Sequence, residues 1–469
     1  MVFANLVFIY LFLPLNLIFY FLRENQAYRN IVLICFSFLF YAWGEPVWVL
    51  LLLVSASFDY MHGRVIECFR GSWIARFSVC ASLLMNLGLL GLFKYSAFIV
   101  ENINAFFGVS FMIPQFQLPI GISFYTFQTI SYVIDVYRGK TEAQKNPAYY
   151  LMYLSMYHQL VAGPVVRYAD VAREIKGRTI DTASFSEGLT RFIVGLTKKV
   201  LMANIAGKFV SQYFDGPFEK LSVAGAWFGA FMFMLQIYYD FSGYSDMAIG
   251  LGRMFGFHYK ENFDYPYISG SITEFWRRWH ISLSSFFRDY VYIPLGGNRK
   301  RPYFNLLVTW FLTGLWHGAS WNFILWGLYY GILILLERLF LSRILDRLPK
   351  LIRHFYTLAA VLIGWVLFYF TDTSRLIQIF RIMFGLEKNP LWDFHVQISL
   401  LNNIFWILLA VLFCAPIVKQ IKDFIGKRLE SANISCLLIF QIPFNIALLV
   451  LCTAQLVGQT YNPFLYYRF

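Results

Sequence analysis

Charged residues are scarce in this chain of 469 residues. They make up 14% of it, whereas hydrophobic residues make up 59%, and the mean hydropathy is +0.56. Soluble globular domains carry roughly 25% charged residues, so that class is excluded. Apolar stretches long enough to cross a bilayer as helices, about 20 residues each, include 2–22, 77–100 and 436–457. The composition therefore predicts an all-α polytopic membrane protein with ten or more transmembrane helices, together with interfacial or re-entrant helices.

Motifs of several common catalytic classes are also missing. The chain contains no His-Glu-x-x-His helix and no EF-hand loop, so no metal site is expected. The run 243–247 lacks the second glycine of a Gly-x-Ser-x-Gly nucleophile elbow, and the run 139–141 lacks the upstream glycine of a phosphate-binding loop. The six cysteines form no Cys-x-x-Cys pair and lie mainly in or near apolar segments, where small packing residues are expected. A serine hydrolase, an ATP-driven pump and a zinc or disulfide protein are therefore not predicted.

Basic residues outnumber acidic ones, 39 to 26, which gives a net charge of +13. Such a balance can indicate a nucleic-acid partner, but here the cations gather in short segments between apolar stretches, such as 299–301 and 419–428. Positive loops of this kind stay on the cytoplasmic side of a membrane and set the topology. We therefore expect the lipid bilayer and no nucleic acid as a partner, although some of these cations could attract an anionic donor at the cytoplasmic face.

No linker, low-complexity tract or repeat of fixed period divides the chain, which predicts a single transmembrane domain over 1–469. Its middle, about 119–327, carries Asp, His, Arg, Ser and Tyr among aromatic residues, whereas the segments on either side are plainer Leu, Ile, Val and Phe. Polar groups at membrane depth have to face protein or water. We therefore expect a buried polar centre enclosed by helices that face lipid.

Two histidines stand out in this middle part, because imidazole can be neutral near physiological pH and can take or give a proton. His280 lies in the run Phe-Trp-Arg-Arg-Trp-His-Ile-Ser-Leu-Ser. At helical spacing Arg277, Ser284 and Arg288 would share one stripe with it. Two interpretations stay open. One is a polar helix face that lines a cavity, where the arginines bind phosphate or carboxylate. The other is a basic amphipathic helix at the membrane interface, in which the histidine is only hydrogen-bonded.

His317 is embedded in apolar sequence with no charge beside it. On a helix it would share a face with Trp310, Thr313, Gly314 and Trp321. Gly314 and Gly318 form a small-residue pair that allows a close helix approach, so we expect His317 to lie against another helix, away from lipid. A charged side chain at that depth costs roughly 2.5 kcal/mol or more. This cost favours a functional role over that of a hydrogen-bonded core histidine.

A third polar run, 236–246, places two acids, Asp240 and Asp246, in an apolar helix. They could orient an imidazole, bind a cation or pair with arginines, and structural pairing is the interpretation we favour. Lys198 and Lys199 are interpreted as a pair at a helix end whose ammonium groups reach the interface. Since the chain has no nucleophile motif, the simplest enzymatic hypothesis is a histidine that acts as general base on an incoming hydroxyl.

Several runs together resemble one known family. They are Met-Val-Phe at 1–3, Phe-Tyr-Ala-Trp at 40–43, and the runs 119–127, 161–168, 240–246, 275–280 and 314–318. With this set the chain resembles, nearly end to end, the membrane-bound O-acyltransferase (MBOAT) family, and most closely its alginate O-acetylation branch. The resemblance implies an MBOAT fold, in which helices pack around a central funnel or tunnel and donor and acceptor meet from opposite faces.

The resemblance also implies roles for individual residues. His317 takes the position of the family's principal catalytic histidine, and His280 that of its second polar active-site residue. The last six residues, 464–469, resemble a Phe-x-Tyr-x-x-Phe ending, in which Tyr466 would receive or relay the acyl group; the alternative is an aromatic-belt terminus. Weaker candidates for donor or acceptor binding are Arg277, Ser284, Arg288, Asp240, Asp246, Trp316 and Asn322.

The hypothesis that follows is a multi-pass O-acyltransferase of the bacterial inner membrane. It moves an acyl group, acetyl in the simplest case, from a cytoplasmic thioester donor for O-acetylation of an exported polysaccharide, directly or through a partner protein. The donor is acyl-CoA or the phosphopantetheine thioester of an acyl carrier protein, no cofactor is bound, and the expected partner is a periplasmic SGNH-type acetyltransferase. His317 would take the hydroxyl proton, while His280 would orient the acceptor or stabilise the oxyanion.

Two alternatives stay open beside this hypothesis. One is an acyltransferase of the same family that acts on lipid or protein, which the alginate-type motifs and the carboxyl-terminal run disfavour. The other is a polysaccharide exporter or flippase without a covalent step, which would be indifferent to the loss of His317. The basic loops fit all of these functions and do not discriminate between them.

Overall fold

The computed structural model describes residues 1–161, 163–417, 419–421, 434–458 and 464–465. For residues 434–440 it describes the backbone alone. The regular secondary structure of the described residues is helical and includes no strand, as the composition predicts. They pack into two compact units. Unit 1 holds the described residues of Met1–Phe192, Tyr244–Glu261 and the carboxyl end, and unit 2 those of Ile193–Gly243 and Asn262–Gln459. That they form one transmembrane domain, as the sequence predicts, stays a prediction.

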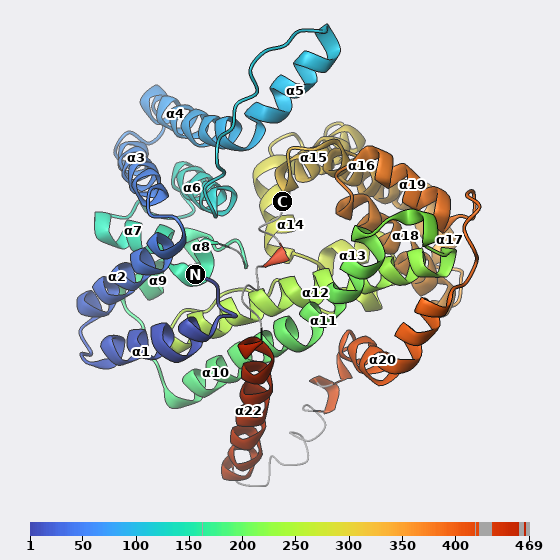
Figure 1. The fold of residues 1–469 in the computed structure, drawn as a ribbon. Helices are drawn as coiled ribbons and strands as arrows, with labels where there is room; N and C mark the ends of the chain where they lie inside the picture. The colour runs from blue at the N-terminus through green and yellow to red at the C-terminus, as the bar shows by residue number, and fades with distance from the viewer. Residues whose placement is uncertain (162, 418, 422–433, 459–463, 466–469) are drawn as a thin grey trace. The chain divides into compact units, whose positions relative to one another are not determined.

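Unit 1 consists mainly of the helices of the amino-terminal part of the chain (Figure 1). They are η1 (Phe8–Phe12), α1 (Leu13–Phe21), α2 (Gln26–Gly44), α3 (Trp48–Cys68), α4 (Trp73–Leu90), η2 (Gly91–Tyr95), α5 (Ser96–Phe107), α6 (Ile122–Tyr137), α7 (Pro147–Ser155), α8 (Tyr157–Leu160), α9 (Tyr168–Lys176) and most of α10 (Thr182–Thr197). Local sequence starts several of them. For example, the side chain of Asn146 caps α7 and Pro147 fills its first position.

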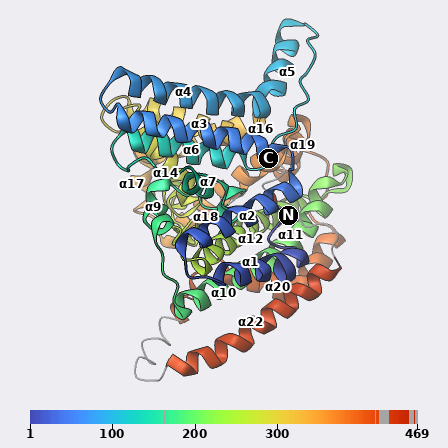
Figure 2. The same ribbon diagram turned by 90° about the vertical axis from the view of Figure 1, so that its left-hand side faces the viewer.

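A buried carboxyl group joins three of these helices, α3, α4 and α6, which lie side by side in Figure 2. Asp59 on α3 accepts hydrogen bonds from Ser82 (2.5 Å) and from the amide of Asn86 (2.9 and 3.0 Å), both on α4. Thr129 on α6 donates to the side-chain oxygen of Asn86 (3.1 Å). Such interhelical bonds hold membrane helices together, because lipid tails are as apolar as the helix surfaces.

Unit 2 contains the remaining helices. They are η3 (Lys198–Ala203), α11 (Asn204–Val210), η4 (Ser211–Asp215), η5 (Phe218–Lys220), η6 (Pro266–Ile268), α13 (Ile272–Arg278), α14 (Ile281–Phe287), η7 (Arg288–Tyr292), α15 (Pro302–His317), α16 (Trp321–Leu336), η8 (Glu337–Leu341), α17 (Ser342–Leu345), α18 (Lys350–Tyr369), α19 (Thr373–Met383), α20 (Phe394–Phe413) and α22 (Ile434–Val457). The 32-residue helix α12 (Val223–Met254) begins in unit 2, and its residues from Tyr244 onward belong to unit 1.

Helices α15 and α16 of unit 2 pack backbone against backbone (Figure 1). A Cβ at Gly314 would lie 2.3 Å from the Phe323 carbonyl oxygen, and a Cβ at Gly327 would lie 2.4 Å from the backbone of α15. The close helix approach predicted from Gly314 is therefore confirmed, because only glycine fits there. Its partner is Gly327, since Gly318 already ends α15 in an extended conformation (φ −172°).

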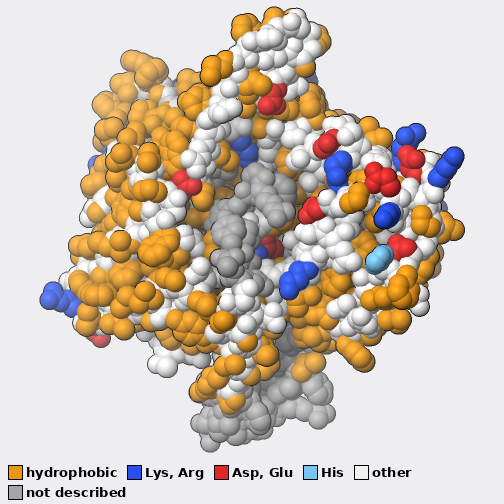
Figure 3. Space-filling model, in the orientation of Figure 1, with side chains coloured by type: hydrophobic (Ala, Val, Ile, Leu, Met, Phe, Trp, Pro, Cys, Tyr) orange, Lys and Arg blue, Asp and Glu red, His pale blue; other side chains and the backbone are white. Residues whose placement is uncertain are grey.

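Among the described residues, six helical segments are long and apolar enough to cross a membrane. They are Gln26–Gly44, Trp48–Cys68, Trp73–Phe107, Trp321–Leu345, Lys350–Tyr369 and Phe394–Phe413, and two shorter apolar helices are Phe8–Phe21 and Gln441–Val457. Large apolar side chains such as Leu84 (75%) and Phe405 (86%) are exposed on them, and hydrophobic side chains cover much of the face in Figure 3. This pattern is that of a multi-pass membrane protein, while ten or more crossings stay a prediction.

Candidate active site

His280 lies in unit 2 at a break between two short helices. Helix α13 ends at Arg278 and α14 begins at Ile281, and His280 between them adopts the left-handed backbone conformation (φ 45°, ψ 54°). A residue other than glycine in this region is uncommon and strained, and such residues cluster at functional sites. The continuous helical stripe predicted through His280 is therefore wrong, because the left-handed turn interrupts the helical repeat.

Asn262 holds this turn in place. Its backbone carbonyl accepts from the Ile281 N–H (2.9 Å), and its side-chain oxygen accepts from the N–H (3.3 Å) and the hydroxyl (2.8 Å) of Ser282. The same side-chain oxygen lies 3.1 Å from Nδ1 of His280. One buried asparagine thus contacts three successive residues of the turn, and it fixes the backbone and the imidazole together.

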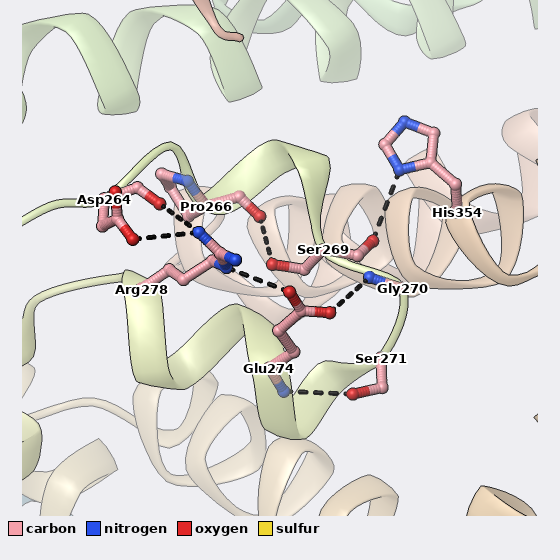
Figure 4. A network of polar contacts seen from close by, with 8 residues as sticks. All are labelled: Asp264, Pro266, Ser269, Gly270, Ser271, Glu274, Arg278 and His354. Atoms are coloured by element: carbon pink, nitrogen blue, oxygen red, sulfur yellow. Dashed lines mark hydrogen bonds and ion pairs between the residues drawn. The ribbon is translucent and has the colours of Figure 1, made fainter. Parts of the chain in front are cut away.

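A polar network ties α13 to the loop that precedes it (Figure 4). Arg278 donates to the carboxylate (2.9 Å) and the backbone carbonyl (3.1 Å) of Asp264, and its Nε donates to Glu274 (3.0 Å). Glu274 in turn accepts from the Gly270 N–H (2.9 Å). Because Arg278 stands two residues before His280, this network holds the chain on the amino-terminal side of the imidazole.

Glu337, at the start of η8, caps the first turn of α13 and is only 2% exposed. Its carboxylate accepts from the N–H groups of Ile272 (2.7 Å) and Thr273 (2.8 Å), and from the hydroxyls of Thr273 (2.6 Å) and Tyr356 (3.2 Å). The first N–H groups of a helix have no partner within the helix and favour a negative charge. Helix α13 is thereby held at the end opposite to His280.

The imidazole of His280 is buried, with 1% of the residue exposed. Phe241 meets it edge to face at 4.6 Å between ring centroids, and the Trp316 ring lies at 6.2 Å. Its Nε2 atom is buried and has no hydrogen-bond partner within the described ranges. Burial lowers the pKa of His280 to about 3, because the charged imidazolium would lose its hydration. The imidazole is therefore neutral at physiological pH.

His317 is the last residue of α15 and is 6% exposed. Its ring contacts include Trp316 at 4.9 Å, Trp326 of α16 at 4.8 Å and Phe368 of α18 at 5.3 Å between centroids. The prediction that His317 lies against another helix is confirmed. Because Trp316 also contacts His280, the two histidines share one aromatic neighbour in unit 2, while their joint role in one catalytic site stays a prediction.

A wall of large aromatic side chains adjoins this site. It consists of Trp276, Trp279, Trp310, Trp326, Tyr330 and Trp365, which contact one another in pairs. Trp326 and Tyr330 are at most 1% exposed. A wall of this kind excludes water, and the low local dielectric strengthens hydrogen bonds and charge interactions. The site is thus suited to a reaction that water would otherwise intercept.

The other residues of the predicted stripe do not join the histidines. Arg277 and Arg288 are exposed, and Arg288 pairs with Asp289 (2.8 Å). Ser284 is half-buried and donates to the backbone carbonyl of Trp276 (3.3 Å). A role for the two arginines in holding donor phosphates stays a prediction, and it would place them at the surface of unit 2.

The two acids of α12 are held in ion pairs. Asp240 pairs with Lys199 at 2.5 Å in unit 2, and both residues are buried. Asp246 pairs with Arg191 at 2.9 Å in unit 1. The structural pairing favoured from the sequence is confirmed. The expectation that Lys199 reaches the interface is wrong, because a buried carboxylate without a cation is costly and Lys199 supplies that cation.

Asn322 is buried, and its side chain caps the carboxyl end of a neighbouring helix. Its amide donates to the carbonyls of Leu367 (3.2 Å) and Phe368 (3.1 Å) near the carboxyl end of α18, where carbonyls have no partner within the helix. Substrate binding by Asn322 stays a prediction.

Tyr466 lies outside the described residues, whereas Phe464 is buried with its ring 4.7 Å from that of Tyr244 in unit 1.

Two residues of the site were not predicted from the sequence. Asn262 stands 18 residues before His280, in a loop to which no periodicity applies. Glu337 had a usable signal, because an acid at the end of an apolar helix marks a paired or functional site. Across the described part of the chain, no group of three or more His, Cys, Asp or Glu residues could hold a metal ion.

Comparison with known proteins finds a family match across this site. The profile described as MBOAT, membrane-bound O-acyltransferase family, matches residues 141–380. The chain is 38% identical to the "Probable alginate O-acetylase AlgI" of Azotobacter vinelandii over 100% of both chains. It is 31% identical to the "Peptidoglycan O-acetyltransferase" of Helicobacter pylori, over 90% of this chain and 87% of that one. It is 27% identical to the "Teichoic acid D-alanyltransferase" of Bacillus subtilis, over 46% of this chain and 58% of that one.

The matched range includes His280, His317 and both residues that hold α13 and its turn, Asn262 and Glu337. The likeness to the Azotobacter protein extends from end to end, and the names of these relatives agree on the transfer of an acyl group. The protein is thus an enzyme, an O-acyltransferase, and the chain belongs to the membrane-bound O-acyltransferase family.

Proposed function

We propose that this O-acyltransferase moves an acetyl group from a thioester donor on the cytoplasmic side of the membrane to hydroxyl groups of an exported polysaccharide, directly or through a partner protein. Two relatives are named for O-acetylation, one of alginate and one of peptidoglycan, which supports both acetyl and a polysaccharide. The observation that carries the reaction is the pair of buried histidines, His280 and His317, that share Trp316 as a neighbour.

In the proposed step the acceptor hydroxyl attacks the thioester carbonyl carbon. A C–O bond forms and the C–S bond breaks, while the imidazole of His317 takes the hydroxyl proton and returns it to the departing thiolate. The products are the acetyl ester and the free thiol, with no change of oxidation state. A positioned general base accelerates such a step by about 10²–10⁴-fold, and the aromatic wall keeps out water that would hydrolyse the thioester.

The donor in this proposal is acyl-CoA or the phosphopantetheine thioester of an acyl carrier protein, since both present a thioester at the end of a phosphate-bearing arm. Arg277 and Arg288 are the proposed phosphate contacts, because guanidinium pairs well with phosphate and both side chains are exposed. A periplasmic SGNH-type acetyltransferase would receive the acetyl group, with Tyr466 as a candidate carrier. The basic loops are consistent with residence in the bacterial inner membrane.

His317→Gln tests the proposal, because glutamine keeps polar atoms near the same place but is no base. His158→Gln is the matched control, since His158 is a fully buried histidine of unit 1 that bonds to the Tyr259 hydroxyl (2.6 Å). In membranes supplied with radiolabelled acetyl donor and polymer, His317→Gln should lower ester-bound acetate on the polymer by about 10²-fold or more, with an unchanged amount of folded protein. The control should retain acetylation.

Full acetylation by His317→Gln would refute the base assignment. A wild-type protein that forms no acetyl ester but is needed for polymer export would refute acyl transfer to polysaccharide, and would favour an exporter. Label that appears in lipid or protein instead of the polymer would redirect the proposal to another acceptor of the same family chemistry.

A further inference from the structure

We propose that Asn262 is a positioning residue that keeps the proton of His280 on Nδ1, so that Nε2 accepts a hydrogen bond from a hydroxyl of the polysaccharide acceptor beside the one that reacts. The inference deepens the proposed function and rests on it for the identity of the hydroxyl. It decides between the two roles that the sequence leaves open for His280. A neutral imidazole with its proton on Nδ1 can orient a hydroxyl, but its Nε2 cannot donate to an oxyanion.

The orientation of the Asn262 amide follows from the backbone. The Ser282 N–H, which is always a donor, points at the side-chain atom of Asn262 that lies 3.3 Å away. That atom has to be the amide oxygen, because the amide nitrogen carries two hydrogens and cannot accept. The assignment of oxygen and nitrogen in this side chain is thus set by a group whose hydrogen is known, whereas most asparagine amides leave it ambiguous.

The tautomer of His280 follows from that orientation. Nδ1 of His280 lies 3.1 Å from the same amide oxygen, and an amide oxygen only accepts, so Nδ1 has to carry the hydrogen. Within the described parts of the chain, the groups found against the imidazole are the neutral side chains of Asn262 and Ser282 and the rings of Phe241 and Trp316. Burial alone lowers the pKa of His280, which keeps the ring neutral and leaves the lone pair on Nε2.

Nε2 is the atom left for a substrate. It is buried and has no hydrogen-bond partner among the residues that the structure describes. A buried polar atom without a partner calls for an explanation, and a position that the substrate fills is one such explanation. With the lone pair there, a second hydroxyl of the polysaccharide acceptor is the partner that fits, and its hydrogen bond holds the acceptor in place while His317 takes the proton of the hydroxyl that reacts.

Asn262 also fixes the direction in which Nε2 points. It accepts from Ile281 and Ser282 on the far side of His280, and so it holds the left-handed turn as well as the ring. Loss of the side chain would release the imidazole and its proton together. A residue of this kind acts through another one, and residues that orient an active group typically change activity or affinity by about 10–100-fold.

The first test reads the tautomer without reading activity. The full-length protein, labelled with ¹⁵N-histidine in lipid bilayers, gives imidazole nitrogen signals by solid-state NMR, and His280→Asn identifies those of His280 among the seven histidines. Near pH 7 we expect a protonated Nδ1 and an unprotonated Nε2. Asn262→Leu should allow the Nε2–H form, whereas Asn305→Leu is the matched control. Asn305 is buried and donates to the carbonyls of Gly297 (3.0 Å) and Lys300 (2.6 Å).

The second test uses Asn262→Asp, which keeps an oxygen opposite Nδ1 and adds a negative charge. The charge should raise the pKa of His280, so acetyl transfer should be lost as pH falls through the raised pKa, in a range where the wild type stays active. Asn262→Leu should lower kcat by about 10–100-fold, but it should not add a loss of activity at acidic pH to the pH profile. A purely structural asparagine would not move the pH profile.

Each outcome bears on one proposal. A wild-type His280 protonated on Nε2, or an Asn262→Asp variant with the wild-type pH profile, would overturn the role of Asn262 even if acetyl transfer is established. If the wild type transfers no acyl group but the NMR shows the Nδ1–H form, the proposed function fails while the action of Asn262 on the imidazole stands.

Discussion

Replacing Glu337 by glutamine should loosen the first turn of α13 without removing any side-chain volume. The carboxylate accepts four hydrogen bonds, two of them from the backbone N–H groups of Ile272 and Thr273. A glutamine offers one oxygen and one NH₂ group in place of two oxygens. One of the two backbone N–H groups would therefore face a donor, and the remaining bond would lose its charge.

The size of the effect follows from these contacts. A buried N–H left without a partner costs about 1–3 kcal/mol, and a hydrogen bond to a charged group is worth about 1 kcal/mol more than one to a neutral group. Opening of the first turn of α13 should thus become easier by about 2–4 kcal/mol, which corresponds to roughly 30- to 1,000-fold faster amide exchange. Acetyl transfer should fall as well, because α13 leads directly to His280.

Hydrogen–deuterium exchange followed by mass spectrometry measures this opening on peptides that cover 271–279. Glu219→Gln is the control, since Glu219 is exposed in η5, and it should leave exchange in that peptide unchanged. An exchange rate within about threefold of wild type in Glu337→Gln would refute the capping role. A general increase over all of unit 2 would show global destabilisation instead of a local cap.

Two further changes test the packing of unit 2. Gly314→Ala should lower the thermal midpoint in detergent by a shift that reflects about 1–3 kcal/mol of overpacking, because the new Cβ would lie 2.3 Å from the Phe323 carbonyl oxygen; an unchanged midpoint would show that α15 and α16 can separate freely. Lys199→Met alone should lower the free energy of unfolding by about 3–5 kcal/mol, because it leaves the buried Asp240 carboxylate without a cation. Lys199→Met together with Asp240→Leu should recover most of that loss. A double variant less stable than the single one, measured by the same midpoints, would contradict this.

The sequence was sufficient for features that depend on local pattern or composition. The shortage of charge predicted helices and membrane, and Gly314 predicted a close helix contact that the structure confirms. The placement of His317 against neighbouring helices followed from its apolar surroundings. In each case a few adjacent residues carry the signal, because burial and helix packing act on the nearest turns of the chain.

The geometry around His280 could not be predicted in the same way. Helical spacing placed Arg277, Ser284 and Arg288 on its face, but a single left-handed residue ended the repeat. That conformation is imposed by Asn262, which is distant in sequence and reaches the turn only in the folded chain. Tertiary contacts of this kind override local propensity, and no periodicity in one sequence reports them.

The backbone angle of His280 has a consequence for how the protein can vary. Glycine adopts the left-handed region freely, and asparagine, aspartate and histidine adopt it several-fold more often than other residues, which pay about 1–2 kcal/mol for it. Only a few residue types can therefore replace His280, because the left-handed backbone conformation already excludes most of them. An alanine there would remove the imidazole and also bend the turn, so that a loss of activity would have two causes. Asparagine removes the imidazole alone, and it is the substitution from which the contribution of the ring can be read.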